Sequence, residues 1–217
     1  MSQTRTVVHL LRHGEGFNPT GVLYGRLPDF HLSEVGRAMA QRLAEHLADH
    51  DLVHLRCSPM ERTQETMAPI AASHDLPVVI DERVIEAGNH LEGQRVAANS
   101  SAFRDPRNWR YFRNPAKPSW GEPYLDIAAR MRLAMRDALD AAAGHEALIV
   151  SHQLPIWTAR SDVEGRRLAH DPRRRQCTLA SLTSFTYIDG RVTSVSYAEP
   201  AADLLPKAKV QKTPAGA

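Results

Sequence analysis

The chain is poor in several features that define particular protein classes. Its 217 residues include only two cysteines, Cys57 and Cys177, which are too few for a disulfide framework or a cysteine-rich metal cluster. No apolar run approaches the length of a membrane span, and the formal net charge of +2 is too small to indicate a nucleic-acid or membrane surface. These shortages favour a protein of the reducing cytoplasm that binds neither nucleic acid nor membranes.

The first residues also lack a recognisable targeting signal. Residues 1–5 are polar and lead directly into an apolar run, without the charged, apolar and small-residue regions of a secretory signal. The composition, 42% hydrophobic and 24% charged, suits one globular domain with a substantial core better than two compact domains.

Histidines and arginines are plentiful, but most of them form no pattern with chemical meaning. Two arginine clusters, 166–167 and 173–175, lack an aromatic stacking platform, so a solvated face is the favoured interpretation. Nine histidines show no metal-ligand spacing, and we therefore expect no metal site: His9, His31, His46, His50, His54, His74, His90, His145 and His170.

Strand and helix patterns alternate along the chain. Buried strands are expected over 7–11, 52–56, 77–80 and 147–151, and helices after Ser33, over 60–73, over 124–143 and from about 155. A hairpin is expected over 178–187 and 192–197. This order predicts a three-layer α/β/α sandwich with a mostly parallel sheet. We expect one domain over 1–199, with a cap or insertion at about 86–123, and a loose tail over 200–217.

Chemistry-bearing residues follow the predicted strands at the points where the strands end. The first strand leads into Arg12-His13, and the last parallel strand into Ser151-His152. Arg62 lies one turn into the helix after the second strand. Because ligands of open α/β sheets bind outside the carboxyl ends of the strands, these side chains should converge. Imidazoles and guanidiniums together can attack and clamp a phosphoryl group. A strand-end histidine satisfied by ordinary hydrogen bonds is the structural alternative.

Four segments together resemble the histidine phosphatase superfamily, which includes the cofactor-dependent phosphoglycerate mutases and many broad phosphatases. They are LLRHGE at 10–15, LSEVG at 32–36, SPMERTQET at 58–66 and IVSH at 149–152. They occur in the order typical of the family, and the resemblance covers about residues 6–198. It implies a phosphoglycerate mutase-like fold.

The resemblance also implies roles for individual residues. His13 would become a transient phosphohistidine, with Arg12, Arg62 and His152 around the phosphoryl group. We expect His152 to be at least partly protonated when an anionic substrate is bound. Asn18 resembles an asparagine that contacts the same phosphate, although a loop asparagine bonded to its own backbone is an alternative.

The proton donor is less tightly specified. The resemblance favours Glu86 as general acid, but the spacing from Glu86 to Gly93 is one residue shorter than we expect for the family. Glu82 and Glu92 therefore stay open as alternatives.

Three functions remain open from the sequence. The first is a metal-independent phosphatase that needs no cofactor and hydrolyses a small phosphate ester through His13. The second is a phosphoglycerate mutase-type transferase, and the third is a catalytically weak protein that binds a phosphorylated ligand. The sequence leaves open whether the chain forms a homodimer.

Overall fold

The computed structural model describes residues 3–95 and 121–205. Most of the predicted cap, at 96–120, and residues 206–217 of the predicted tail lie outside these ranges. Among the described residues, no helix is both long and apolar enough to cross a membrane.

Six strands form one mixed sheet in the order β3-β2-β4-β1-β5-β6. The strands are β1 (Arg5–Arg12), β2 (Leu52–Cys57), β3 (Val78–Ile80), β4 (Glu146–Ser151), β5 (Leu182–Ile188) and β6 (Arg191–Ala198). β1, β2, β3 and β4 run parallel, whereas β5 and β6 pair antiparallel at one edge. The predicted mostly parallel sheet is confirmed.

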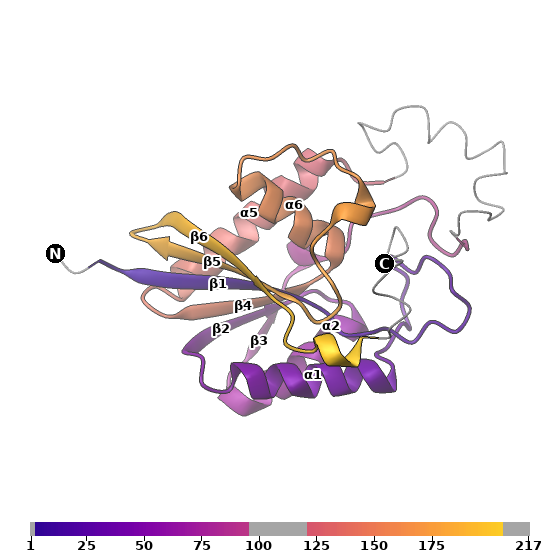
Figure 1. Ribbon diagram of the computed structural model, residues 1–217, viewed down its shortest axis with the longest axis horizontal. Helices are drawn as coiled ribbons and strands as arrows, with labels where there is room; N and C mark the ends of the chain where they lie inside the picture. The colour runs from indigo at the N-terminus through magenta and orange to yellow at the C-terminus, as the bar shows by residue number, and fades with distance from the viewer. Residues whose placement is uncertain (1–2, 96–120, 206–217) are drawn as a thin grey trace.

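Four helices cover the two faces of the sheet and complete the three layers (Figure 1). α1 (Glu34–Leu47) and α2 (Glu61–His74) lie on one face, and α5 (Tyr124–Ala141) and α6 (Gln153–Val163) lie on the other. Each parallel strand is followed by a helix or a turn, as the alternating pattern predicts.

Side chains alternate between the two faces of the sheet, and this alternation divides the core into two halves. In β1, Val8 and Leu10 face α5 and α6, whereas Leu11 faces α1 and α2, because successive strand residues point to opposite faces. Met39 and Leu43 of α1 complete the second half at helical spacing. Every residue of β1 after Arg5 is buried, so this strand is the centre of the fold.

Two segments differ from the predictions. The helix expected from about Pro155 begins at Gln153, directly after His152. The loose tail expected over 200–217 is packed at its start: residues 202–204 form a 3-10 turn, Ala201 is buried and Arg42 of α1 binds Asp203 at 3.0 Å. The apolar residues Leu204 and Leu205 pack against the α1 and α2 half of the core, which sets this segment apart from a loose tail.

Candidate active site

The register of the parallel strands brings the two motif histidines together. Arg12, the last residue of β1, pairs with Ser151, the last residue of β4. His13 and His152 therefore follow directly after two neighbouring strand ends. Their rings lie 5.1 Å apart between centroids, in an edge-to-face arrangement. Both side chains are completely buried. The predicted convergence at the carboxyl edge therefore occurs in the structure.

His13 is oriented by its own loop. Its Nδ1 lies 2.7 Å from the carbonyl oxygen of Gly14, which can only accept, so Nδ1 carries the hydrogen. Nε2 is buried and makes no hydrogen bond within the part of the chain that the structure describes. Burial, together with the positive charges of Arg62 and Arg12, holds the pKa of His13 well below its ordinary value. The ring is consequently neutral, with a lone pair on Nε2.

Two glycines make room for this loop to pack against α1. A Cβ at Gly36 would lie 2.0 Å from the carbonyl oxygen of Glu15, and one at Gly14 would lie 2.7 Å from the carbonyl oxygen of Gly36. Ser33 caps α1 through Gly36 N at 2.9 Å and donates to Glu15 at 3.0 Å. The segment LSEVG thus packs against residues 14–15 and so fixes the position of the loop that carries His13.

Arg62 is a buried cation that pairs directly with no carboxylate of residues 3–95 and 121–205. Its Nη2 donates to the carbonyl oxygen of Gly25 at 2.7 Å and to Nδ1 of His152 at 3.2 Å. Its Nε and Nη1 are buried and bind no described residue. The guanidinium lies over the ring of Tyr24, and burial lowers its pKa. A buried guanidinium with unused donors suits an oxyanion ligand.

Arg12 is held by the chain that follows α6. Its Nη1 donates to the carbonyl oxygen of Cys177 at 2.7 Å, and the side chain is buried. Its charge lowers the pKa of both His13 and His152. The two arginines therefore act on the same pair of imidazoles.

The tautomer of His152 is set by Arg62. Since a guanidinium only donates, Nδ1 of the neutral ring accepts, and Nε2 donates to Oγ of Ser58 at 2.8 Å. Burial, followed by the charge of Arg62, holds the pKa of His152 well below its ordinary value. The structure thus has a neutral His152, and the partial protonation expected with substrate stays a prediction. Ser58 belongs to the quoted motif, but the sequence did not single it out as a site residue.

Among the three candidate acids, the geometry favours Glu86. Glu86 is buried, its carboxylate accepts from the backbone of Ala87 at 2.8 Å, and desolvation raises its pKa even though Arg62 and Arg12 oppose the shift. Glu82 is exposed on a 3-10 turn. Glu92 accepts from the backbone nitrogen of Arg26 at 3.1 Å and supports the surrounding loop.

Asn18 faces its own loop in the structure. Its amide nitrogen donates to the carbonyl oxygen of Val22 at 2.8 Å, and its oxygen accepts from the backbone nitrogen of Val22 at 3.3 Å. This arrangement matches the alternative interpretation of the sequence, in which Asn18 is a loop asparagine bonded to its own backbone. A phosphate contact by Asn18 stays a prediction, for which the amide nitrogen has a second hydrogen.

Arg175 is a site residue that the sequence placed on a solvated face. Its neighbours Arg173 and Arg174 are exposed, but Arg175 is partly buried and burial lowers its pKa. Its Nη1 donates to Gln153 at 3.2 Å, whose own amide donates to the Cys177 carbonyl that Arg12 also uses. Its charge also reaches Glu86 and opposes the raised pKa of that carboxyl. No sequence signal separates Arg175 from the exposed arginines beside it.

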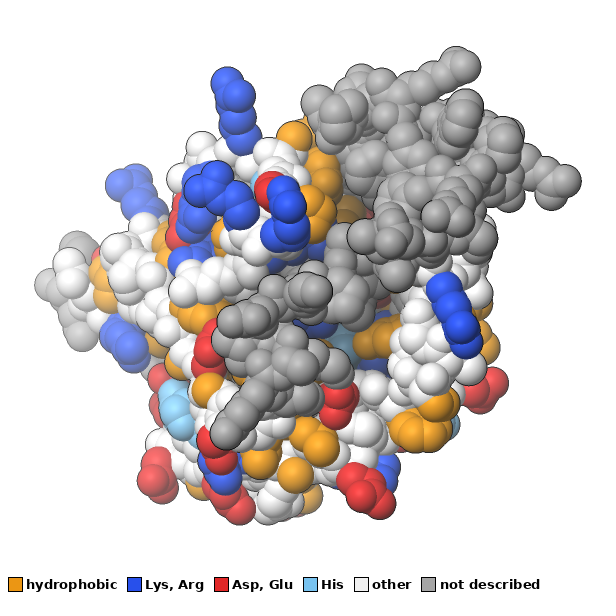
Figure 2. All heavy atoms as spheres, turned by 45° about the vertical axis from the view of Figure 1, so that its right-hand side comes forward, with side chains coloured by type: hydrophobic (Ala, Val, Ile, Leu, Met, Phe, Trp, Pro, Cys, Tyr) orange, Lys and Arg blue, Asp and Glu red, His pale blue; other side chains and the backbone are white. Residues whose placement is uncertain are grey.

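Arginine side chains are gathered on one part of the surface. Figure 2 shows them above a hollow near the middle of the face, in which a histidine side chain is visible.

Comparison with known proteins agrees with this geometry. The model of the histidine phosphatase superfamily (branch 1) matches residues 8–200, a range that includes every motif and every candidate residue named above. This chain belongs to the histidine phosphatase superfamily. Its strand-end histidines and arginines therefore belong to a member of a family that includes phosphatases and mutases.

Individual relatives span most of the chain. It is 57% identical over 197 residues to uncharacterized protein Rv0525 of Mycobacterium tuberculosis, covering 91% of this chain and 98% of that protein. It is 29% identical over 186 residues to probable phosphoglycerate mutase GpmB of Yersinia pestis, covering 83% and 84%. The solved structure of Bacillus stearothermophilus YhfR matches with a TM-score of 0.73 at 26% identity, covering 87% and 94%.

Proposed function

We propose that this histidine phosphatase superfamily member is a phosphomonoesterase that hydrolyses a small phosphate ester through a phosphohistidine at His13. The observation that carries the proposal is the orientation of His13. Nδ1 is fixed as donor to Gly14 at 2.7 Å, while the buried Nε2 binds none of the described residues. A neutral imidazole held in this way is prepared to act as a nucleophile.

In the first step, Nε2 of His13 attacks phosphorus and the bond from phosphorus to the ester oxygen breaks. Arg12 and Arg62 neutralise the phosphoryl oxygens, which gain negative charge in the transition state. The leaving oxygen takes the proton of Glu86, whose pKa is raised by burial. The products of the step are the free alcohol and a phosphohistidine.

In the second step, water replaces the alcohol. The Glu86 carboxylate accepts a proton from the water as its oxygen attacks phosphorus, and the bond from phosphorus to Nε2 breaks. Inorganic phosphate leaves, with His13 neutral and Glu86 protonated again. The same acid therefore serves both steps.

Arg175 supports a substrate with a second negative group. Glu86 and Arg175 act on each other electrostatically, so the cation lies on the side of the pocket where the leaving alcohol would be protonated. Its guanidinium donates to His170 at 2.8 Å and to Gln153 at 3.2 Å, and these partners are uncharged when His170 is neutral. We infer that a carboxylate or second phosphate of the alcohol portion binds there.

Turnover of 4-nitrophenyl phosphate in chelator-treated buffer tests the function directly. We expect wild-type turnover, loss in His13→Ala, and wild-type rates in the matched control His145→Ala, whose imidazole is exposed and pairs with Asp51. Acid-labile phosphate trapped on wild type but not on His13→Ala would support the intermediate. Full turnover by His13→Ala would refute it.

A second assay separates hydrolysis from phosphoryl transfer. The similarity to a probable phosphoglycerate mutase makes 3-phosphoglycerate the appropriate probe. Incubation with a bisphosphoglycerate primer should release inorganic phosphate. Accumulation of 2-phosphoglycerate without phosphate release would instead assign a mutase.

A further inference from the structure

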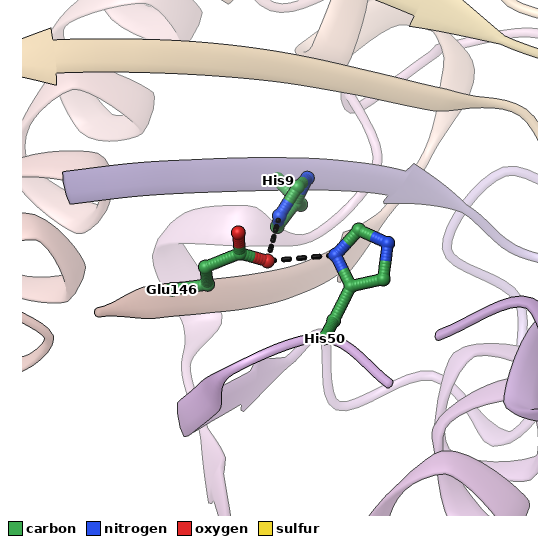
Figure 3. Close-up of side chains that lie close together, drawn as sticks. All are labelled: His9, His50 and Glu146. Carbon is green, nitrogen blue, oxygen red and sulfur yellow. Dashed lines mark hydrogen bonds and ion pairs between the residues drawn. The ribbon is translucent and has the colours of Figure 1, made fainter. Parts of the chain in front are cut away.

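A second group of chemically active side chains lies at the opposite edge of the sheet from His13. It consists of His9 in the middle of β1, His50 in the turn after α1 and Glu146 at the start of β4. Figure 3 shows the three side chains pointing toward one another from these separate elements. One nitrogen of each imidazole and one carboxylate oxygen all lie within 4.8 Å of one another.

We propose that His9, His50 and Glu146 form a binding site for a single divalent transition-metal ion, with zinc as the best match. Two imidazole nitrogens and one carboxylate oxygen are a known donor set for zinc, with water free to take a fourth position. Harder ions such as magnesium and calcium prefer oxygen ligands throughout.

The distances require only small movements for coordination. Nε2 of His9 lies 3.0 Å from Oε2 of Glu146, and Nδ1 of His50 lies 2.7 Å from the same oxygen. Ligands at zinc–ligand distances of about 2.0–2.2 Å in a tetrahedron are roughly 3.3–3.5 Å apart. Changes of under about 1 Å at these two contacts would therefore make room for the ion.

The surroundings hold the ligands in position. His9 is buried in the central strand, and its other ring nitrogen lies 2.7 Å from Oγ of Ser184 on β5. This contact fixes the ring with Nε2 toward the cluster, as the partners of metal-bound histidines commonly do. His50 and Glu146 are partly exposed, with side-chain exposures of 31% and 16%, so an ion can enter from solvent.

The site is separate from the proposed reaction. Glu146 is the first residue of β4 whereas His152 follows its last, and His9 lies in the middle of β1, four residues before His13. A bound ion would join β1 and β4 to the turn after α1 without touching the phosphate pocket. Its expected effect is stability, because a ligand that binds only the folded state favours folding.

Zinc binding to the tag-free, chelator-treated full chain tests the proposal. We expect one zinc per chain by calorimetry, and a melting temperature raised by about 5–10 °C when free zinc is a hundredfold above Kd. His50→Gln should abolish both effects. His145→Ala, which removes an exposed imidazole of the same edge, should keep both.

The two histidines of the phosphate pocket need their own control. His13→Ala removes one of them and should still bind one zinc, whereas His13→Ala combined with His50→Gln should bind none. X-ray absorption of the zinc-loaded chain should show nitrogen and oxygen ligands, with two imidazoles. The proposal is overturned if wild type binds no zinc, if His50→Gln binds as wild type does, or if His13→Ala abolishes binding.

Discussion

The two edges of the sheet use the same residue types for different chemistry. At the carboxyl edge, His13 and His152 lie among the cations Arg12 and Arg62, and burial lowers the pKa of both imidazoles. At the amino edge, His9 and His50 share the carboxylate of Glu146, whose pKa falls to about 2. The sign of the neighbouring charge distinguishes the two pairs.

This difference explains what each pair can bind. Imidazoles surrounded by guanidiniums favour an anion between them, because the fixed positive charge outweighs any negative charge nearby. Imidazoles that share a carboxylate favour a cation, or a proton, between them. A histidine pair in a sequence is therefore ambiguous until its charged neighbours are known.

Among substitutions at the carboxyl edge, replacing His13, the proposed nucleophile, should lower turnover most. We expect His13→Ala to lower kcat for 4-nitrophenyl phosphate by at least about 10³-fold, because no other group can form the covalent intermediate. Steady-state kinetics measure the loss, and circular dichroism verifies the fold. A loss of under about tenfold would mean that His13 does not carry the phosphoryl group.

Glu86→Gln should have the next largest effect, and the effect should depend on the leaving group. We expect kcat/KM to fall by about 10²–10⁴-fold for an alkyl phosphate and by much less for 4-nitrophenyl phosphate, whose leaving group needs little protonation. Equal losses on both esters would show that Glu86 acts by some means other than proton donation.

The pH profile follows from the same two groups. Glu86 must be protonated, so the wild-type rate should fall as pH rises through its pKa, which burial raises. His13 must be neutral, so the rate should also fall as pH drops through its lowered pKa. Glu86→Gln should lose the alkaline limb of kcat/KM and keep the acid limb. A retained alkaline limb would assign that limb to another group.

Arg175→Gln should give a moderate effect that appears only with some substrates. If Arg175 binds a second anionic group, KM for 3-phosphoglycerate should rise by about tenfold or more, while that for 4-nitrophenyl phosphate should stay near wild type. The exposed Arg173 provides the matched control in Arg173→Gln. A similar KM change on both substrates would contradict the assigned subsite.

The amino edge should show a smaller effect, on stability and not on turnover. With chelator present, Glu146→Gln should lower the free energy of unfolding by about 1–3 kcal/mol, because two imidazoles lose a charged acceptor. Urea denaturation measures the change, and turnover of 4-nitrophenyl phosphate should be unaltered. A large loss of turnover would show that the two edges are coupled.

This contribution also has a defined pH dependence. The pKa of Glu146 is about 2 in the folded chain and near 4.5 when unfolded. The unfolded chain therefore takes up a proton first, and the stabilisation is present above pH 4.5 and lost as pH falls toward 2. The stability difference between wild type and Glu146→Gln should shrink over that window.

The convergence of His13 and His152 at the carboxyl edge could be predicted from the sequence, because the topology of the parallel strands determines it. His13 and His152 each follow a buried parallel strand, and such strands end at a common edge whatever their register. The close contacts between the backbones at Gly14 and Gly36 needed coordinates.

Two features could not be anticipated from the pattern. His9 and His50 have no metal-ligand spacing, because their proximity depends on where the turn after α1 lies against the start of β4. Arg175 lies in the same run of arginines as the exposed Arg173 and Arg174, and its partial burial and its hydrogen bonds to His170 and Gln153 separate it from them.

The segment that leads into the antiparallel hairpin also determines when the site around His13 can be complete. The carbonyl oxygen of Cys177 holds Arg12, that of Ser181 accepts from the backbone of Arg12, and Ala180 N donates to the carbonyl oxygen of His13. At biosynthetic rates, the 165 residues between Arg12 and Cys177 correspond to about 10–30 s of synthesis. His13, the proposed nucleophile, is thus among the first residues made, and the surroundings that hold it are completed among the last.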